Sequence, residues 1–330
     1  MYKKVYVCCP GNAITAGPEA IHQLVADLNR LGQPSAVVYF PFESNFSTVP
    51  AYQKYQAPVA KYVDEKDSLI ILPEIVTTYA FNVRNAKVAI WWMSVNNFTC
   101  QRYGYVWRDK LRYFKYFLKG LRPLRGIRSL RKFIHFAQSN YALDFLKKNH
   151  IDGLMLSDPI PVYTSKAYLD SIDDRNAVAK RENIILYNPH KGALITKILM
   201  QRYPSWTFKP LQGYNREQLA DIFLSSKIYI DFGHHPGKDR LPREAAVHGC
   251  CVITGLNGSA GNDLDVNIPP IYKFSEHDSE FELKVGILVE DIFQNFEKHF
   301  EIFHEYRQTI ANEQIEFDKQ ICQIFGLTSP

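Results

Sequence analysis

Short apolar runs rich in β-branched residues alternate with helical patterns along this chain, and that alternation limits its fold more than any other feature. Between the first two runs, residues 19–31 carry apolar side chains at helical spacing and stop before Gly32. Near-continuous apolar strands separated by helices are typical of a parallel sheet covered on both faces. The strands expected in the first half span 4–9, 35–40, 68–75, 87–95 and 133–138.

The alternation starts again after a Pro-containing stretch near residues 157–166. The strands expected there span 183–187, 206–210, 227–232 and 250–254, and residues 279–325 read as helices only. We therefore predict an α/β protein of two domains, 1–160 and 161–330, with a ligand cleft at the carboxyl ends of the two sheets. The terminal helices either close over the second domain or return to the first.

The chain shows no pattern of export or membrane crossing. Its first apolar run is too short for a signal peptide, and its longest apolar stretches, 68–75 and 88–95, fall far below the ~20 residues of a membrane span. Four of the six cysteines form adjacent pairs, Cys8-Cys9 and Cys250-Cys251, inside expected strands. Neighbours in a strand face opposite sides, so we expect reduced, buried thiols in a cytoplasmic protein.

The net charge of +5 is unevenly distributed. The segment from Arg102 to Lys132 holds eleven basic residues and one acid, Asp109, which leaves a net charge of −5 on the rest. This concentration indicates one local polyanionic partner and argues against a surface that coats nucleic acid.

The basic segment also contains an amphipathic helical pattern over 106–122. An apolar stripe and a basic stripe lie about a quarter-turn apart, which is typical of a helix in an anionic membrane interface. The alternative is that the apolar stripe packs on the first sheet. Nucleic-acid binding is a weaker third interpretation, because no recognition motif accompanies the charge. We favour membrane contact, with candidate contact residues Trp107, Arg112, Lys115 and Lys119.

Two loops of the second half carry candidate phosphate ligands. The expected strand 183–187 ends in Asn188-Pro-His-Lys191-Gly192, where a cation beside a helix start suits a diphosphate; a turn with a solvated lysine is the alternative. The expected strand 227–232 ends in a loop that leads to a helix with Glu244 in its first turn, suited to ribose hydroxyls. The alternatives are that the helix dipole stabilises Glu244 and that Arg243 pairs with it. The further candidates in this loop are Gly233, His234, His235, Lys238 and Arg243.

Three blocks resemble motifs of the nucleotide-sugar-dependent glycosyltransferases of GT-B fold, most like glycosyltransferase family 4. Residues 242–254 resemble the family's Glu-Ala-x-x-x-Gly-x-Pro-Val-Ile block, 186–192 its strand-to-helix turn, and 15–32 its N-terminal Gly-Gly-x-Glu and Leu-x-x-x-Gly block. The resemblance implies two Rossmann-like domains that face each other across a cleft. It places the acceptor on the first domain and the donor on the second. It also implies that Lys191 and either Lys238 or Arg243 bind the diphosphate, and Glu244 the ribose.

The chain departs from the family at one position. The family's Glu-x7-Glu pair requires an acid at position 236, which is Pro236 here. Asp231, His234 or His235 are candidates to replace it. Ser259 belongs to a loop, 257–262, whose amides are candidate donor contacts. The catalytic candidates are Glu19 and Glu74, for which a first-turn acid and a cap are the alternatives, together with His234 and His235.

We expect neither a metal nor another cofactor, because the nucleotide sugar is a co-substrate and GT-B enzymes usually dispense with metal. Asp263-Leu-Asp265 matches a metal-diphosphate pattern of the other major glycosyltransferase fold, but such a tripeptide is common by chance. His234, His235 and His248 show no metal-ligand spacing to a Cys or carboxylate set in the sequence.

The sequence thus predicts a glycosyltransferase that moves a sugar from a nucleotide-sugar donor to a glycan or lipid-linked acceptor. The expected setting is surface polysaccharide biosynthesis (capsule, O-antigen or lipopolysaccharide), peripheral to the inner face of the cell membrane. A nucleotide-sugar epimerase and a non-catalytic GT-B glycan-binding module are the alternatives. The donor sugar, the base, the acceptor and the stereochemical outcome stay open.

Overall fold

The computed structural model describes residues 1–99, 106–120, 126–160, 178 and 180–328. The last two residues of the 106–122 amphipathic pattern, Leu121 of its apolar stripe and Arg122 of its basic stripe, lie outside the described residues, as does much of the 157–166 stretch. Of Arg112 the helical backbone is described but not the side chain. The chain divides into two compact units. Unit 1 is Met1–Pro159 with Pro236–Lys238 and Gln314–Pro330, and unit 2 is Ile160–His235 with Asp239–Glu313.

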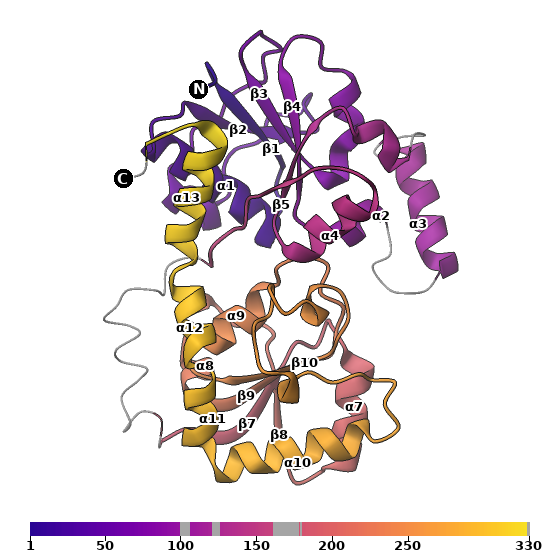
Figure 1. The fold of residues 1–330 in the computed structure, drawn as a ribbon, viewed down its shortest axis with the longest axis vertical. Helices are drawn as coiled ribbons and strands as arrows, with labels where there is room; N and C mark the ends of the chain where they lie inside the picture. The colour runs from indigo at the N-terminus through magenta and orange to yellow at the C-terminus, as the bar shows by residue number, and fades with distance from the viewer. Residues whose placement is uncertain (100–105, 121–125, 161–177, 179, 329–330) are drawn as a thin grey trace. The chain divides into compact units, whose positions relative to one another are not determined.

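Unit 1 is built on a six-stranded parallel sheet of order β2-β1-β3-β4-β5-β6 (Figure 1). The strands are β1 (Val5–Pro10), β2 (Ser35–Phe40), β3 (Leu69–Pro73), β4 (Lys87–Trp92), β5 (Ile134–Ala137) and the short β6 (Leu154–Met155). The helices and 3-10 turns of the unit are α1 (Ala16–Arg30), η1 (Pro50–Tyr55), η2 (Glu74–Phe81), α2 (Val95–Thr99), α3 (Val106–Leu118), η3 (Ile127–Leu130) and α4 (Asn140–Lys148).

Both faces of the unit 1 sheet are buried. Cys9 and Trp91 belong to the core on the face covered by α1, whereas Cys8 and Trp92 belong to clusters on the other face. This is the alternation expected for adjacent residues of a strand. Both tryptophans are almost fully buried, which ties β4 into the core on each side.

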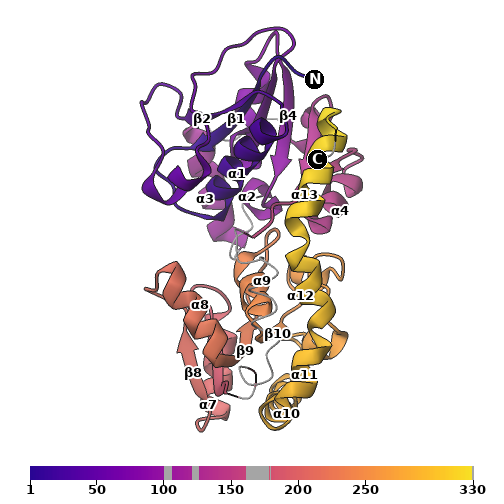
Figure 2. The same ribbon diagram turned by 90° about the vertical axis from the view of Figure 1, so that its left-hand side faces the viewer.

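The last helix, α13 (Glu313–Phe325), joins unit 1 from Gln314 onward. It lies beside α1, where the Arg30 guanidinium donates to Asp318 at 2.6 Å (Figures 1 and 2). Phe317 and Ile321 are fully buried in the same core as α1. Of the two alternatives for the terminal helices, this one therefore returns to the first unit.

Unit 2 is built on a four-stranded parallel sheet of order β10-β9-β7-β8 (Figure 1). The strands are β7 (Glu182–Tyr187), β8 (Thr207–Pro210), β9 (Ser226–Asp231) and β10 (Cys251–Thr254). The helices and 3-10 turns are α7 (Ala193–Arg202), α8 (Arg216–Ser225), α9 (Arg240–Val247), η4 (Ser259–Gly261), η5 (Pro270–Tyr272), α10 (Phe281–Gln294), α11 (Phe296–Ile302) and α12 (His304–Ala311).

The central strands of unit 2 point their carboxyl ends at one edge of the sheet. β9 lies between β7 and β10, so the turn after β7 and the loop after β9 are neighbours. α8, α9 and α10 all pack on β9, and a single hydrophobic cluster runs through the unit. The predicted α/β class with two parallel sheets is confirmed.

The amphipathic helix α3 does not bury its apolar stripe. The described members of the stripe are more than half exposed: Trp107 by 65%, Leu111 by 59%, Phe114 by 57% and Leu118 by 69%. The alternative interpretation, in which this stripe packs on the first sheet, is therefore wrong for these side chains.

Candidate nucleotide-binding site

Two loops of unit 2 meet backbone against backbone at the carboxyl ends of β7 and β9. Gly192 precedes α7 with φ 62°, in the left-handed region that favours glycine. A methyl group added to Gly192 would lie 2.7 Å from the backbone nitrogen of Gly233. One added to Gly233 would lie 2.5 Å from Cβ of Lys191. Only glycines allow this approach, which holds Lys191 next to the end of β9.

Lys191 is paired inside this site. Its Nζ contacts Oδ2 of Asp239, the residue that precedes α9, and the two side chains are 31% and 18% exposed. Asn188 shapes the turn, because its Oδ1 accepts the N–H of His190 at 2.9 Å. Lys191 thus lies where the sequence predicts a phosphate-binding cation, with part of its surface open to solvent.

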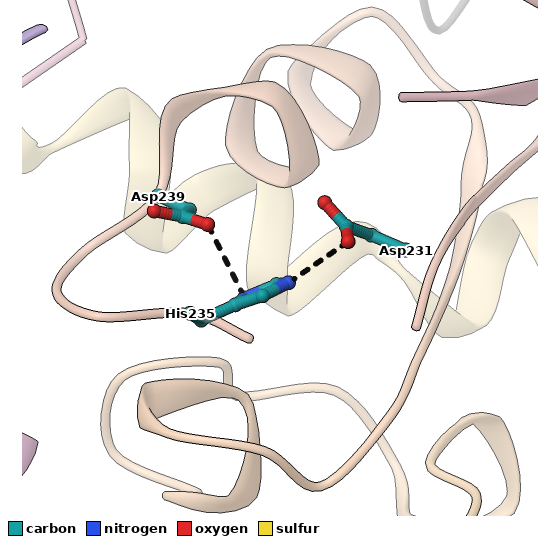
Figure 3. A group of neighbouring side chains, drawn as sticks. All are labelled: Asp231, His235 and Asp239. Atoms are coloured by element: carbon teal, nitrogen blue, oxygen red, sulfur yellow. Dashed lines mark ion pairs between the residues drawn. The ribbon is translucent and has the colours of Figure 1, made fainter. Parts of the chain in front are cut away.

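His235 lies between two carboxylates (Figure 3). Its Nε2 is 3.4 Å from Oδ1 of Asp231, and its Nδ1 is 3.9 Å from Oδ2 of Asp239. The imidazole is fully buried, and Asp231 is nearly so. Spacing in the sequence does not indicate this carboxylate pair, because Asp239 reaches the ring only where the loop after β9 folds back.

The backbone of His235 is held by the 257–259 segment. The His235 N–H donates to the Asn257 carbonyl at 3.1 Å, and the Ser259 N–H donates to the His235 carbonyl at 2.8 Å. Gly258 has φ 72°, and a methyl group there would lie 2.0 Å from the His235 carbonyl oxygen. The Ser259 amide, a candidate donor contact, is therefore used to hold the loop.

Charge and burial oppose each other in this cluster. Burial lowers the pKa of His235, but the charges of Asp231 and Asp239 raise it, and the net pKa lies above its ordinary value. Burial raises the pKa of Asp231, but His235, Lys191 and the Gly233 N–H lower it to a net value below normal. Burial together with the charges of His235 and Lys191 lowers the pKa of His234, so His234 is neutral at pH 7.

These distances also bear on metal binding. One ring nitrogen of His235 and one oxygen each of Asp231 and Asp239 lie within 4.8 Å of one another. The two carboxylates, however, face different ring nitrogens (Figure 3). Metal ligands converge on one point, so the arrangement fits an imidazole held between two carboxylates better than an ion site.

Arg243 and Glu244, the other donor candidates, lie on α9. The sequence predicts Glu244 in the first turn, but α9 begins at Arg240 and its first turn holds no acidic residue, so that expectation is wrong. Arg243 is 2% exposed, and its guanidinium donates to Oε2 of Glu313 at 2.7 Å and to the Asp239 carbonyl at 3.1 Å. Glu244 is one-fifth exposed, with Nε of Arg240 at 3.6 Å from its Oε1. Arg243 thus has a carboxylate partner in the core of unit 2, which the sequence did not indicate, since Glu313 lies 70 residues further along.

Lys238 belongs to a short segment that groups with unit 1, where its N–H donates to Oε1 of Gln138 at 3.2 Å. In the Asp-x-Asp tripeptide, Asp263 is exposed and pairs with Nζ of Lys273 at 2.7 Å, whereas Asp265 is buried.

The two acidic candidates of unit 1 are buried. Oε1 of Glu19 accepts the Tyr55 hydroxyl at 2.8 Å and lies 3.0 Å from Nζ of Lys54. Glu74 accepts the N–H of Met93 at 3.2 Å and the Asn97 amide at 2.9 Å. Each carboxylate is thereby bonded within its own unit.

The membrane candidates lie on α3. Trp107, Lys115 and Lys119 are exposed, and the side chain of Arg112 is outside the described part of the chain. Among the helices that the structure describes, none is long and apolar enough to cross a membrane.

Comparisons with known proteins show what fold this is. No protein-family model matches the chain, and no curated protein matches it. HepE of Anabaena, solved in complex with UDP-glucose, is 10% identical over 98% of this chain and 99% of its own, with a TM-score of 0.59. Sucrose-phosphate synthase of Thermosynechococcus elongatus is 12% identical over 98% of both chains, with a TM-score of 0.62. WaaG, a glycosyltransferase involved in lipopolysaccharide biosynthesis, is 11% identical over 96% of this chain and 99% of its own, with a TM-score of 0.60. The chain has the fold of these GT-B glycosyltransferases, as the sequence resemblance implied.

Proposed function

Because the chain has the GT-B fold, we propose that it is a glycosyltransferase that moves a sugar from a nucleotide-sugar donor to an acceptor. The observation that carries the proposal is the loop pair of unit 2, where Gly192 and Gly233 pack together and hold Lys191 at the carboxyl ends of the central strands. Strand ends of this kind are where α/β folds bind nucleotides. HepE, which shares the fold, was solved with UDP-glucose, and we take uridine diphosphate as the first ligand to test.

In this proposal Lys191 binds the donor diphosphate and stabilises the charge that develops on the departing nucleoside diphosphate. Glu244, one-fifth exposed on α9, accepts hydrogen bonds from the ribose. Asn188, Gly233 and Ser259 shape the loops around the donor. Of the two candidates for a second cation, Lys238 and Arg243, Arg243 is buried against Glu313. Neither a metal nor another cofactor takes part.

His234 is our candidate for the side chain that replaces the missing acid at Pro236. Its Nε2 is buried and has no hydrogen-bond partner among the described residues, and its lowered pKa keeps it neutral at pH 7. A neutral imidazole can accept a hydrogen bond or a proton from a sugar hydroxyl. Glu19 and Glu74, which are bonded within unit 1, are better suited to shaping the loops there.

Nucleotide affinity tests the donor site directly. Calorimetry with UDP should show binding that falls 10-fold to 100-fold in Lys191→Ala, since a charge-assisted hydrogen bond contributes about 1.5–3 kcal/mol. Lys197→Ala is the matched control, because Lys197 is an exposed lysine of α7 in the same unit. Equal UDP affinity in wild type and Lys191→Ala would reject this donor site. Turnover of UDP-glucose with and without an acceptor separates transfer from epimerisation, and glycan binding without turnover indicates a binding module.

We further propose a peripheral location at the cytoplasmic face of the membrane, with a glycan or lipid-linked acceptor of surface polysaccharide biosynthesis. The apolar stripe of α3 supports this, because Trp107, Leu111 and Phe114 are exposed next to lysines. WaaG, which shares the fold, is involved in lipopolysaccharide biosynthesis.

Vesicle sedimentation tests the membrane proposal. Lys115→Glu with Lys119→Glu should reduce binding to phosphatidylglycerol vesicles at least 30-fold, because each basic residue near the surface contributes about 1 kcal/mol. Lys61→Glu with Lys66→Glu changes charge equally at exposed loop positions and should have little effect. Equal loss in both variants would mean that total charge, and not α3, drives the binding.

A further inference from the structure

The buried imidazole of His235 has a carboxylate facing each of its two ring nitrogens. One carboxylate lies at each ring nitrogen, Asp231 at Nε2 and Asp239 at Nδ1, with separations of 3.4 and 3.9 Å (Figure 3). Neither ring nitrogen has a hydrogen-bond partner in the described residues, so the carboxylates are the groups that these nitrogens face.

The protonation state of the ring follows from this geometry. A neutral imidazole carries one N–H and one lone pair, so one carboxylate would face a lone pair in a buried setting. An imidazolium presents an N–H on both sides and offsets one of the two negative charges. The net pKa of His235 agrees with an imidazolium. Burial lowers the pKa, but the charges of Asp231 and Asp239 raise it by more, so that the net value lies above the ordinary one.

The other ionisable groups around the ring come from three elements. Tyr229 on β9 donates its hydroxyl to Oδ2 of Asp231 at 3.0 Å. Lys191, in the β7–α7 turn, forms an ion pair with Asp239. His234 is the neighbour of His235 in the chain, and its lowered pKa keeps it neutral at pH 7. On α9, Arg240 and Glu244 lie together. The 257–259 segment that holds the His235 backbone has no ionisable side chain.

Lys191 and His235 therefore share the carboxylate of Asp239. With His235 charged, two cations face Asp231 and Asp239, and the cluster is neutral. With His235 neutral, the charge of Lys191 is more than offset by two carboxylates, and the cluster repels an anion. The charge on the ring thus decides how much positive potential Lys191 presents.

We propose that His235 is a positioning residue, carried as an imidazolium, that engages Asp239 and so leaves the charge of Lys191 available for the donor diphosphate. This inference rests on the proposed donor site. It assigns His235 a role behind the phosphate-binding lysine rather than at the reacting sugar.

The affinity for UDP-glucose as a function of pH tests the inference. The diphosphate diester of this probe keeps its charge between about pH 5.5 and 8.5, so a pH effect arises from the protein. Wild-type affinity should fall about tenfold as the pH rises through the pKa of His235, because one charge near Lys191 is lost. His235→Gln should bind weakly with little pH dependence, and His277→Asn, an exposed histidine elsewhere in unit 2, should behave as wild type.

Lys191→Met and the double variant with His235→Gln separate positioning from folding. If His235 acts through Lys191, adding His235→Gln to Lys191→Met should change UDP-glucose affinity less than twofold. An effect in the double variant as large as in His235→Gln alone would overturn the inference.

The protonation state of the His235 ring can also be measured directly in wild type, which keeps the inference testable if His235→Gln does not fold. Nitrogen-15 NMR of wild type should show two protonated ring nitrogens for His235 at pH 7. A neutral ring at pH 6 would overturn the inference, as would a metal ion that copurifies in stoichiometric amount and whose removal by EDTA abolishes UDP-glucose binding. Failure of wild type to bind UDP-glucose at any pH would instead reject the donor site, and the NMR result would still decide the charge.

Discussion

The ion pair between Arg243 and Glu313 offers the sharpest test of how unit 2 uses its cations. Arg243 is 2% exposed and Glu313 is 7% exposed, and the guanidinium donates to Oε2 at 2.7 Å. The same oxygen accepts the N–H of Ile160 at 3.0 Å. The chain enters unit 2 at Ile160 and leaves it after Glu313, so one carboxylate ties both ends of the unit to α9.

The perturbation is Arg243→Met, which removes the guanidinium and leaves the carboxylate buried. Breaking a buried pair in this way costs about 3–5 kcal/mol. We expect the lower end, about 3 kcal/mol, because the Ile160 N–H still bonds Glu313. Replacing both partners, as in Arg243→Met with Glu313→Gln, should recover most of that loss, since no unpaired charge then remains. Arg240→Met on the same helix should cost less than about 1 kcal/mol, as its partner Glu244 is at 3.6 Å on a more open surface.

Urea unfolding of the four proteins measures these differences, and UDP calorimetry on the folded variants gives the second reading. Because Arg243 is used inside the unit, the UDP affinity of Arg243→Met should stay within about twofold of wild type. A variant that keeps its stability but loses more than tenfold in UDP affinity would refute the structural assignment. The diphosphate role suggested by the sequence resemblance would then be correct.

Three further predictions concern single residues. Burial lowers the pKa of His248 to about 4. The unfolded chain therefore binds a proton at His248 more readily than the folded protein, and the free energy of unfolding should fall by ~3 kcal/mol as the pH drops from 6.5 towards 4. Urea unfolding of His248→Gln should lack this fall. Gly233→Ala would place a methyl group 2.5 Å from Cβ of Lys191, so UDP affinity should fall at least tenfold while the circular dichroism spectrum stays unchanged. Gly126→Ala is the control, because Gly126 has open space around it, and its UDP affinity should equal that of wild type. Burial raises the pKa of the Cys250 thiol to about 12, so iodoacetamide at pH 8 should modify Cys250 only in denaturant. Mass spectrometry measures the labelling, and rapid labelling of Cys250 in the native protein would contradict this.

The fold class and the place of the proposed phosphate-binding turn could be predicted from the sequence, because both depend on local patterns. Apolar runs such as 68–75 can be buried on both sides only in a covered parallel sheet, and a covered parallel sheet brings its loops to one edge. Lys191 lies in the short turn between β7 and α7, so its position at that edge follows from its place in the chain. The opposite faces of Cys8 and Cys9 follow in the same way from strand geometry.

The sequence could not predict which side chains the site residues contact. Arg243 and Glu313 are 70 positions apart, and Asp239 reaches His235 only because the loop after β9 turns back. No periodicity governs a loop, so spacing in the chain does not indicate which side chains meet there. The terminal helix shows the same limit, since its buried Phe317 and Ile321 would suit the core of either unit.

The sequence by itself determined two parallel sheets, the strand ends that carry the candidate site, and a helix with one apolar and one basic face. These follow from local periodicity and from the charge on neighbouring residues. Only the tertiary structure decided that Arg243 is neutralised in the core, that His235 lies between two carboxylates, and that the apolar stripe of α3 is exposed. The physical reason is that a charge acts through the groups within a few ångströms of it, and folding chooses those groups from distant parts of the chain.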